Sequence, residues 1–180
     1  MEFDDVIRQR TSIRAYEPIP VDDSLIQNIL ENARLAPSWM NRQCWHFVII
    51  TDTMIIQEIA KTGIINRWLK QAPVIIIACA DPHRSGENNE IPYYAVDTAI
   101  AMQHLILSAT NVGLGTCWIG SFDERRIKTL LEIPPRIRII ALTPLGYPKE
   151  KKAFGDKSRK MFIRSTTRKR LDEIVHWEHW

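Results

Sequence analysis

Residues 93–112 constrain the fold more than any other segment, because apolar side chains occur on nearly every side of one helical stretch. A helix of this kind has to be surrounded by other elements. Gly113 follows at the position where a left-handed residue commonly ends a helix. Several residues of the segment are small and would let a second helix approach closely, so we expect a central helix that is compatible with a dimer core. Its apolar residues are Ala95, Val96, Ala99, Ile100, Met102, Leu105, Ile106, Leu107, Ala109 and Val112.

Four other segments are predicted to be strands. Residues 45–51 and 74–80 are short runs rich in β-branched side chains, bounded by turn residues or by Pro73, which is typical of buried strands with helices on their faces. Residues 116–120 and 136–146 have the same character. We therefore expect a layered arrangement of helices and strands.

Further helices are expected between these strands. The apolar spacing over residues 22–36 favours a helix that Asp22 or Asp23 caps and Pro37 ends. The remaining predictions are one or two helices within residues 53–69, interrupted at Gly63, a polar loop over 81–92, and a short helix over 123–131 with Asp123 as its cap.

Composition indicates one ordinary globular domain spanning residues 1–180. The chain has 45% hydrophobic and 25% charged residues. It has no apolar run near the roughly 18 residues of a membrane helix, and it begins with acidic residues where a secretory signal would be basic. Three widely spaced cysteines predict neither a disulfide framework nor a zinc cluster. We expect a cytoplasmic protein with no membrane partner.

The net charge of +3 hides a strongly basic segment. Residues 149–170 hold ten Lys or Arg against two acidic residues, a local charge of +8, so the rest of the chain carries −5. One alternative is an arm that binds nucleic acid. The segment contains no recognisable nucleic-acid-binding motif, however, and we expect no nucleic-acid partner. Trp177 and Trp180 need a surface that covers them. Residues 149–180 are thus expected to be a basic arm on a neighbouring subunit, with folding back onto their own body as the alternative.

Two cation clusters lie at opposite ends of the chain. In an extended segment, Arg10, Ser12 and Arg14 would share one face, and Thr11 adds a hydroxyl. Guanidinium groups and hydroxyls together form a phosphate clamp. For Arg10, complementing the dipole of the preceding helix is the alternative role.

Two loops carry further candidates. Ser38, Asn41 and Gln43 lie between a helix and a strand, where their groups suit either turn formation or recognition of a heteroaromatic ring edge. The second loop contains Gly113 and Gly115, but Trp118 replaces the third glycine of a dinucleotide fingerprint and the element order is reversed, which excludes a Rossmann site.

Together these motifs resemble the FMN-dependent nitroreductase family. The likeness covers nearly the whole chain: R-T-S-I-R near the start, A-P-S-x-x-N-x-Q-x-W, A-P-V-I-I-I, G-L-G-T-C-W-I-G, and K-x-R near the end. The family implies an α+β fold, a three-layer α/β/α sandwich with a mainly antiparallel central sheet. It also implies a homodimer with exchanged C-terminal arms.

The resemblance assigns site residues and an activity. NADH or NADPH would reduce bound FMN, which would reduce a nitro compound, quinone or similar acceptor in a ping-pong cycle. Flavin would carry the chemistry, with no catalytic side chain, and amides near Ile119 and Gly120 would stabilise negative charge on the ring. The implied phosphate ligands are Arg10, Thr11, Ser12, Arg14, Lys157 and Arg159; the implied ring contacts are Ser38, Asn41, Gln43, Cys117, Trp118, Ile119 and Gly120.

Some features leave alternatives open. Cys44, Trp39 and Met40 depart from the family pattern and would narrow or cover the pocket. A flavin-binding module without turnover is the second functional hypothesis. His176 and His179 have a spacing that suits a metal, but no third ligand is evident and we expect none.

Overall fold

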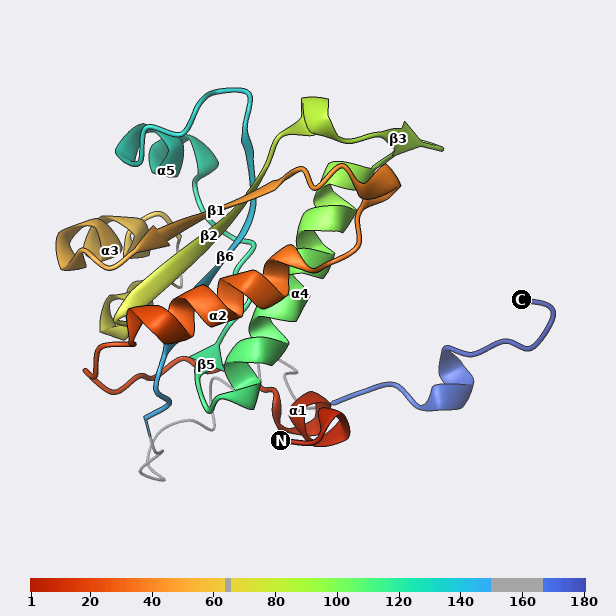
Figure 1. Ribbon diagram of the computed structural model, residues 1–180, viewed down its shortest axis with the longest axis horizontal. Coiled ribbons are helices and arrows are strands. Elements are labelled where there is room, and N and C mark those ends of the chain that lie inside the picture. Colours follow the sequence, from red (N-terminus) through yellow and green to blue (C-terminus); the bar gives the residue numbers. More distant parts are fainter. Residues whose placement is uncertain (64–65, 150–166) are drawn as a thin grey trace. The chain divides into compact units, whose positions relative to one another are not determined.

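A four-stranded antiparallel sheet forms the centre of the larger part of the chain (Figure 1). The computed structural model describes residues 1–63, 66–149 and 167–180, which belong to two compact units, Met1–Lys149 and Glu150–Trp180. The strands lie in the order β1-β2-β6-β5. Their bounds are β1 Trp45–Ile50, β2 Val74–Ala80, β5 Gly115–Thr116 and β6 Arg138–Gly146.

Helices cover both faces of this sheet. Alternation along the fully buried β2 sends Ile75 and Ile77 into one core and Val74 and Ile76 into another. The first core also contains residues of α3, η2 and α5, and the second contains residues of α2 and α4. The predicted three-layer α/β/α arrangement with an antiparallel sheet is therefore confirmed.

The helix predictions are confirmed in their positions and in their caps. The predicted caps Asp22 and Asp123 each accept a hydrogen bond from a backbone amide in the first turn that follows, and Asp52, which was not predicted as a cap, does the same for the helix after it. The helices of the larger unit are α1 Phe3–Gln9, α2 Asp23–Arg34, η1 Trp39–Asn41, α3 Thr53–Ala60, η2 Arg67–Gln71, η3 Pro82–Arg84, α4 Tyr93–Asn111 and α5 Glu124–Leu130.

The central helix α4 packs on the sheet and on α2. Met102 and Leu105 are almost fully buried, and Gly113 has a φ of 79°, so it ends the helix in the left-handed region as expected. A stripe of α4, composed of Val96, Ile100, Gln103 and Leu107, stays exposed or only half-buried. The spacing of three and four residues places them on one side of the helix.

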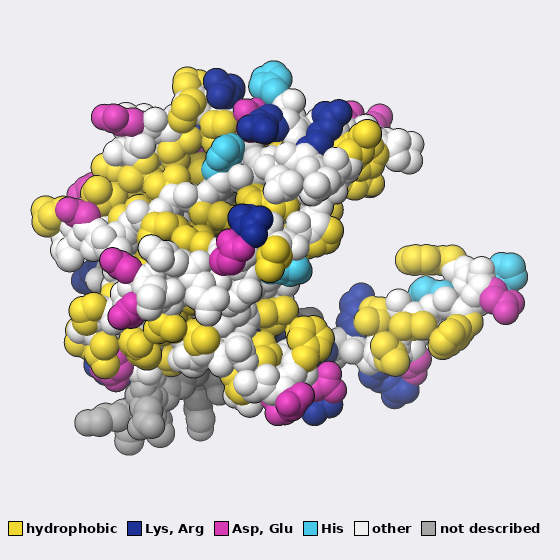
Figure 2. All heavy atoms as spheres, viewed as in Figure 1, with side chains coloured by type: hydrophobic (Ala, Val, Ile, Leu, Met, Phe, Trp, Pro, Cys, Tyr) yellow, Lys and Arg dark blue, Asp and Glu magenta, His cyan; other side chains and the backbone are white. Residues whose placement is uncertain are grey.

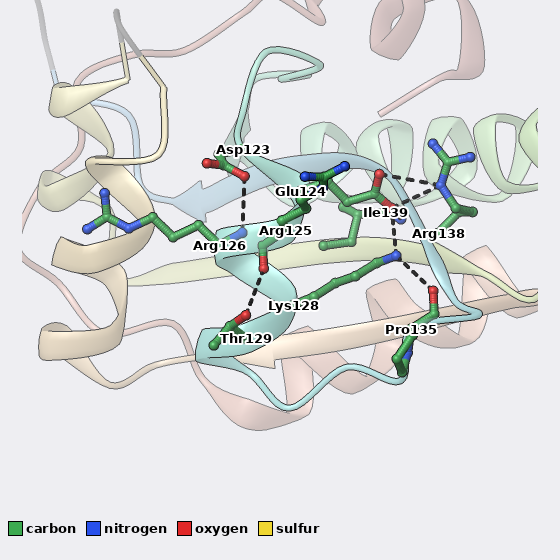
Figure 3. A network of polar contacts seen from close by, with 9 residues as sticks. All are labelled: Asp123, Glu124, Arg125, Arg126, Lys128, Thr129, Pro135, Arg138 and Ile139. Carbon is green, nitrogen blue, oxygen red and sulfur yellow. Dashed lines mark hydrogen bonds and ion pairs between the residues drawn. The ribbon is translucent and has the colours of Figure 1, made fainter.

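Glu124 anchors α5 to the neighbouring strand (Figure 3). Its carboxylate lies 3.1 Å from Lys128 Nζ and 3.0 Å from Arg138 Nε, and accepts the amide of Ile139 at 3.0 Å. Partial burial alone would raise the pKa of Glu124, but the hydrogen bonds from Arg138, Ile139 and Lys128 outweigh it and lower the pKa to about 2. This network fixes the start of α5 against β6.

Two segments differ from the sequence predictions. The loop expected over residues 81–92 contains a two-stranded hairpin of β3 Glu87–Asn88 and β4 Ile91–Pro92, whose turn residues Asn89 and Glu90 both have positive φ. The strand expected over residues 116–120 is shorter: β5 ends at Thr116, and Ile119 only bridges to Leu142. Two-residue strands are too short to show a period in the sequence.

The described part of the second unit, residues 167–180, contains one short helix, η4 Leu171–Glu173. Its large apolar side chains are exposed (Figure 2), with Trp177 at 87% and Trp180 fully accessible. The ring of His176 stacks on that of Trp180, with 4.6 Å between their centroids. The predicted exchange of this arm between subunits involves residues outside the described ranges and stays a prediction.

Candidate functional site

Residues 10–14 run beside β5. The amide of Ile13 donates to the carbonyl of Thr116 at 2.8 Å, and Ser12 bridges to Thr116 in a parallel sense. In this extended conformation alternate side chains share a face, so the backbone supports the predicted grouping of Arg10, Ser12 and Arg14.

A small hollow of about 90 Å³ opens beside this segment. Three parts of the chain that are far apart in sequence line it, and among them are Arg10, the amide-bearing Gln103, and the hydroxyl-bearing Ser12 and Thr116. This donor set suits a phosphate or another small oxyanion. The lining residues are Arg10, Ser12, Gln103, Ile106, Thr116, Cys117 and Trp118. The structure thus brings together four of the predicted site residues, whereas Thr11 is exposed and does not line the hollow.

Arg14 lies next to this group without lining the hollow. Its Nη1 donates to the carbonyl of Ser12 at 3.5 Å. Burial raises the pKa of the Cys117 thiol, and the opposing effects of Arg14, Ser12 and Arg10 do not offset it. Cys117 is therefore a neutral, buried thiol whose surroundings carry positive charge, rather than a nucleophile.

The backbone after β5 is held by the next strand. The amide of Cys117 donates to Thr143 Oγ1 at 3.1 Å, and the amide of Ile119 donates to the carbonyl of Leu142 at 2.9 Å. The Ile119 amide is thus already hydrogen-bonded within the chain, and its expected role in stabilising charge on a ligand stays a prediction. Trp118 is 41% exposed at the rim of the hollow, and Gly120 is also exposed.

The loop of Ser38, Asn41 and Gln43 is a tight, internally bonded turn. Ser38 Oγ accepts the Gln43 amide at 2.9 Å, and Gln43 Nε2 donates to Asn41 Oδ1 at 3.1 Å. Met40, Asn41 and Gln43 have φ values of 48°, 56° and 49°. The side chains of Asn41 and Gln43 are exposed, so their remaining hydrogen-bonding groups are available to a ligand.

This loop lies far from the hollow in a single chain. Its Trp39 contacts Asp97 and Tyr93 near the start of α4, whereas Ile106 lines the hollow nearer the other end. The nine residue steps from Asp97 to Ile106 correspond to about 14 Å along the helix axis. Figure 1 shows the same separation, with β5 and α1 at one end of α4. One chain therefore holds two separate halves of the predicted site.

The bulky departures from the family pattern do not fill the hollow. The rings of Trp39 and Tyr93 pack with 4.2 Å between centroids, and Met40 is 75% exposed. Cys44 is fully buried and faces Asp97. Lys157 and Arg159 lie outside the described residues, so their predicted contribution to the clamp stays a prediction.

A larger hollow of about 500 Å³ lies elsewhere, between α3 and η2. None of the predicted site residues that the structure describes lines it. We place the candidate site at the smaller hollow because the chemistry-bearing motifs converge there, while the larger one is an open depression whose cations are exposed. The larger hollow is lined by Gln57, Ala60, Lys61, Arg67 and Lys70.

Sequence reasoning missed Gln103 and Asp97. Asp97 is the only acidic residue of α4, and a carboxylate in a mainly apolar helix is the signal that would have singled it out, whereas Gln103 is one of several polar residues in this helix. Gln103 lines the hollow, and the buried Asp97 accepts a hydrogen bond from the amide of Trp39 at 3.0 Å.

Other kinds of site find no support in the described residues. Within residues 1–63, 66–149 and 167–180, no group of His, Cys, Asp or Glu is arranged to hold a metal ion. No helix in the same ranges is long and apolar enough to cross a membrane.

Comparison with known proteins identifies relatives along most of the chain. A model of the nitroreductase family matches residues 7–62 and 52–147. A protein of Archaeoglobus fulgidus, provisionally named an NADH dehydrogenase/NAD(P)H nitroreductase, is 35% identical over 83% of this chain and 87% of its own length. The crystal structure of a nitroreductase family protein from Clostridium novyi NT is 39% identical, with a TM-score of 0.81 and coverage of 83% and 87%. An FMN reductase [NAD(P)H] of Bacillus subtilis is 28% identical over 84% of this chain and 69% of its own length.

Proposed function

The chain belongs to the nitroreductase family, and we propose that it is an FMN-dependent oxidoreductase that accepts electrons from NADH or NADPH. One observation carries the proposal: Arg10 and Ser12 meet Cys117 and Trp118 around a single hollow, although more than one hundred residues separate the two pairs. The relatives named for FMN or NAD(P)H supply the identity of the ligands.

The donor set fits the phosphate end of FMN. Arg10 and Ser12, whose side chains end in a guanidinium and a hydroxyl, line the hollow, and the positive charge of Arg14 acts on the neighbouring Cys117. Each charge-assisted hydrogen bond contributes about 1.5 to 3 kcal/mol. Lys157 and Arg159 are proposed to complete the clamp. When bound, the flavin supplies the hydride and electron transfer, so the protein needs only to bind, orient and shield it.

The hollow is too small for the whole cofactor. Pockets for ligands of this size are roughly 300 to 1,000 Å³, whereas this one is about 90 Å³. We therefore propose that a second copy of the chain completes the site, with its 38–43 loop over the flavin ring. The exposed stripe of α4 supports this arrangement, since Gln103 belongs both to the stripe and to the wall of the hollow.

The exposed amide groups of the loop are proposed to read the edge of the ring. Asn41 and Gln43 each combine donors with an acceptor, which matches the alternating groups of a flavin pyrimidine. The backbone amide at Gly120 is proposed to face the ring where negative charge develops on reduction. The proposed acceptor is a nitro compound, a quinone or a similar small molecule, reduced in a ping-pong cycle.

A cytoplasmic location is part of the proposal, because NADH and NADPH are reductants of the cell interior. All three cysteines are buried and free, which agrees with a reducing compartment.

Purification followed by anaerobic mixing tests the function. Protein expressed in a flavin-replete host is expected to be yellow, to lose its visible absorbance on addition of NADH or NADPH, and to regain it with a nitroaromatic compound or a quinone. Protein that neither carries nor takes up FMN would contradict the proposal. Protein that binds FMN but is not reduced by either nucleotide would favour the flavin-binding module without turnover.

A further inference from the structure

Asp97 is a buried carboxylate and the only acidic residue of helix α4. The residue is only 2% exposed. Among the described residues, no Lys, Arg or His forms an ion pair with its carboxylate. Burying a carboxylate is costly unless several donors satisfy it. The contacts of Asp97 should therefore show why a carboxylate is buried at this position.

The contacts of Asp97 bracket the strained part of the 38–43 loop. Oδ1 accepts the amide of Trp39 at 3.0 Å, and Oδ2 lies 3.8 Å from the thiol of Cys44. Ser85 Oγ donates to the same Oδ2 at 3.4 Å. Trp39 and Cys44 are the residues immediately before and immediately after residues 40–43. A single side chain thus holds both ends of this stretch.

The bracketed stretch needs such an anchor. Met40, Asn41 and Gln43 all have backbone conformations in the left-handed region, although none of them is glycine. Conformations of this kind persist only where the surroundings enforce them, and they are concentrated at functional sites. The Ser38 hydroxyl supplies a second anchor by accepting the Gln43 amide.

We propose that Asp97 is a positioning residue that holds residues 40–43 in this conformation and thereby aims Asn41 and Gln43 at the flavin. The part concerning flavin rests on the proposed function, whereas the part concerning the loop does not. A carboxylate suits the task because it accepts hydrogen bonds from three donors without presenting a competing donor of its own. Its charge also strengthens the bond from the Trp39 amide.

Two substitutions separate the charge from the shape. Asp97→Asn keeps the shape and one oxygen acceptor but loses the charge, and Asp97→Ala removes both. Thr110→Val is the matched control: Thr110 lies on the same helix and donates to Ile106 O at 2.9 Å, so its loss costs a hydrogen bond without touching the loop.

Amide hydrogen exchange of the flavin-free protein is the first readout. Exchange at residues 39–44 is expected to accelerate in a graded way, least in wild type, more in Asp97→Asn and most in Asp97→Ala, with Thr110→Val like wild type. If Asp97→Ala does not fold, Asp97→Asn decides the matter by itself. Wild-type exchange rates at residues 39–44 in either folded variant would overturn the proposal.

Flavin binding is the second readout and keeps the two proposals distinguishable. We expect the FMN dissociation constant of Asp97→Ala to rise on the order of tenfold, the visible circular dichroism of bound FMN to change, and Asp97→Asn to recover part of both. Accelerated exchange with unchanged FMN affinity and dichroism would overturn the role in aiming the amides. If wild type itself does not bind FMN, the proposed function fails, and the exchange experiment still decides whether Asp97 holds the loop.

Discussion

The side chain of Ile13 occupies the space that a side chain at position 115 would need. A Cβ on Gly115 would lie 2.8 Å from Cβ and Cγ1 of Ile13, closer than non-bonded carbons can pack. The same two segments are joined by the hydrogen bond from the Ile13 amide to the Thr116 carbonyl. Glycine at this position therefore lets the segment that carries Arg10, Ser12 and Arg14 lie flat against β5.

Gly115→Ala is expected to displace this segment. Overpacking of this kind costs about 1 to 3 kcal/mol of unfolding free energy, and FMN affinity should fall because Arg10 and Ser12 move with Ile13. Denaturant unfolding and fluorescence titration with FMN measure the two effects. Gly113→Ala is the control: φ there is 79° and nothing lies within 4 Å of the added Cβ, so it should cost stability but leave FMN affinity unchanged. Equal FMN affinity in both variants would contradict the account.

A charge on the exposed stripe of α4 is expected to separate the proposed dimer. Val96 is 37% exposed in the single chain, so Val96→Glu should fold normally yet place a carboxylate in the interface, where it has no partner. Sedimentation is expected to give a mass of two chains for wild type and of one chain for Val96→Glu, with loss of bound FMN.

Met54→Glu is the matched control for this interface, because Met54 is 69% exposed on α3 on the opposite side of the sheet from α4. It should remain a flavin-binding dimer. A Val96→Glu variant that keeps the wild-type mass would show that this stripe is not the interface.

Glu124 predicts an acid-sensitive contribution to stability. Its folded-state pKa of about 2 lies below the usual value of 4.5, so the native state favours the ionised form. The contribution is fully present above about pH 4.5 and is lost as the pH falls towards 2. Since the side chain is partly exposed, we expect about 2 kcal/mol. The free energy of unfolding, measured with urea between pH 2 and pH 6, should change less with pH for Glu124→Gln than for wild type. The same pH dependence of the free energy of unfolding in both proteins would contradict this role of Glu124.

The sequence predicted the elements that have strong local signals. The run of β-branched residues in β2, the capping carboxylates and Gly113 all lie where the pattern placed them, because each depends on chemistry within a few residues. The grouping of Arg10 and Ser12 with Cys117 and Trp118 was predicted only through the family resemblance. Nothing within either segment specifies that the two are adjacent.

Tertiary contacts account for what the sequence did not reveal. The hydrogen bond from the Ile119 amide to Leu142 was not predicted, because the apolar pattern of two strands does not specify which residues of one lie opposite which residues of the other. Asp97 was not singled out, because its importance depends on Trp39, Cys44 and Ser85, which are separated in sequence. The distance between the 38–43 loop and the hollow along α4 could likewise be seen only in the folded structure.

The affinity for FMN compared with that for riboflavin, which lacks the phosphate, tests the central claim most directly. If the hollow at Arg10 and Ser12 holds the phosphate, wild type should bind FMN more than a hundredfold more tightly than riboflavin. Arg10→Ala should remove most of that preference, while Arg8→Ala, which changes an exposed arginine paired with Asp4, should retain it. Equal affinities for FMN and riboflavin in wild type, or an undiminished preference in Arg10→Ala, would contradict the account.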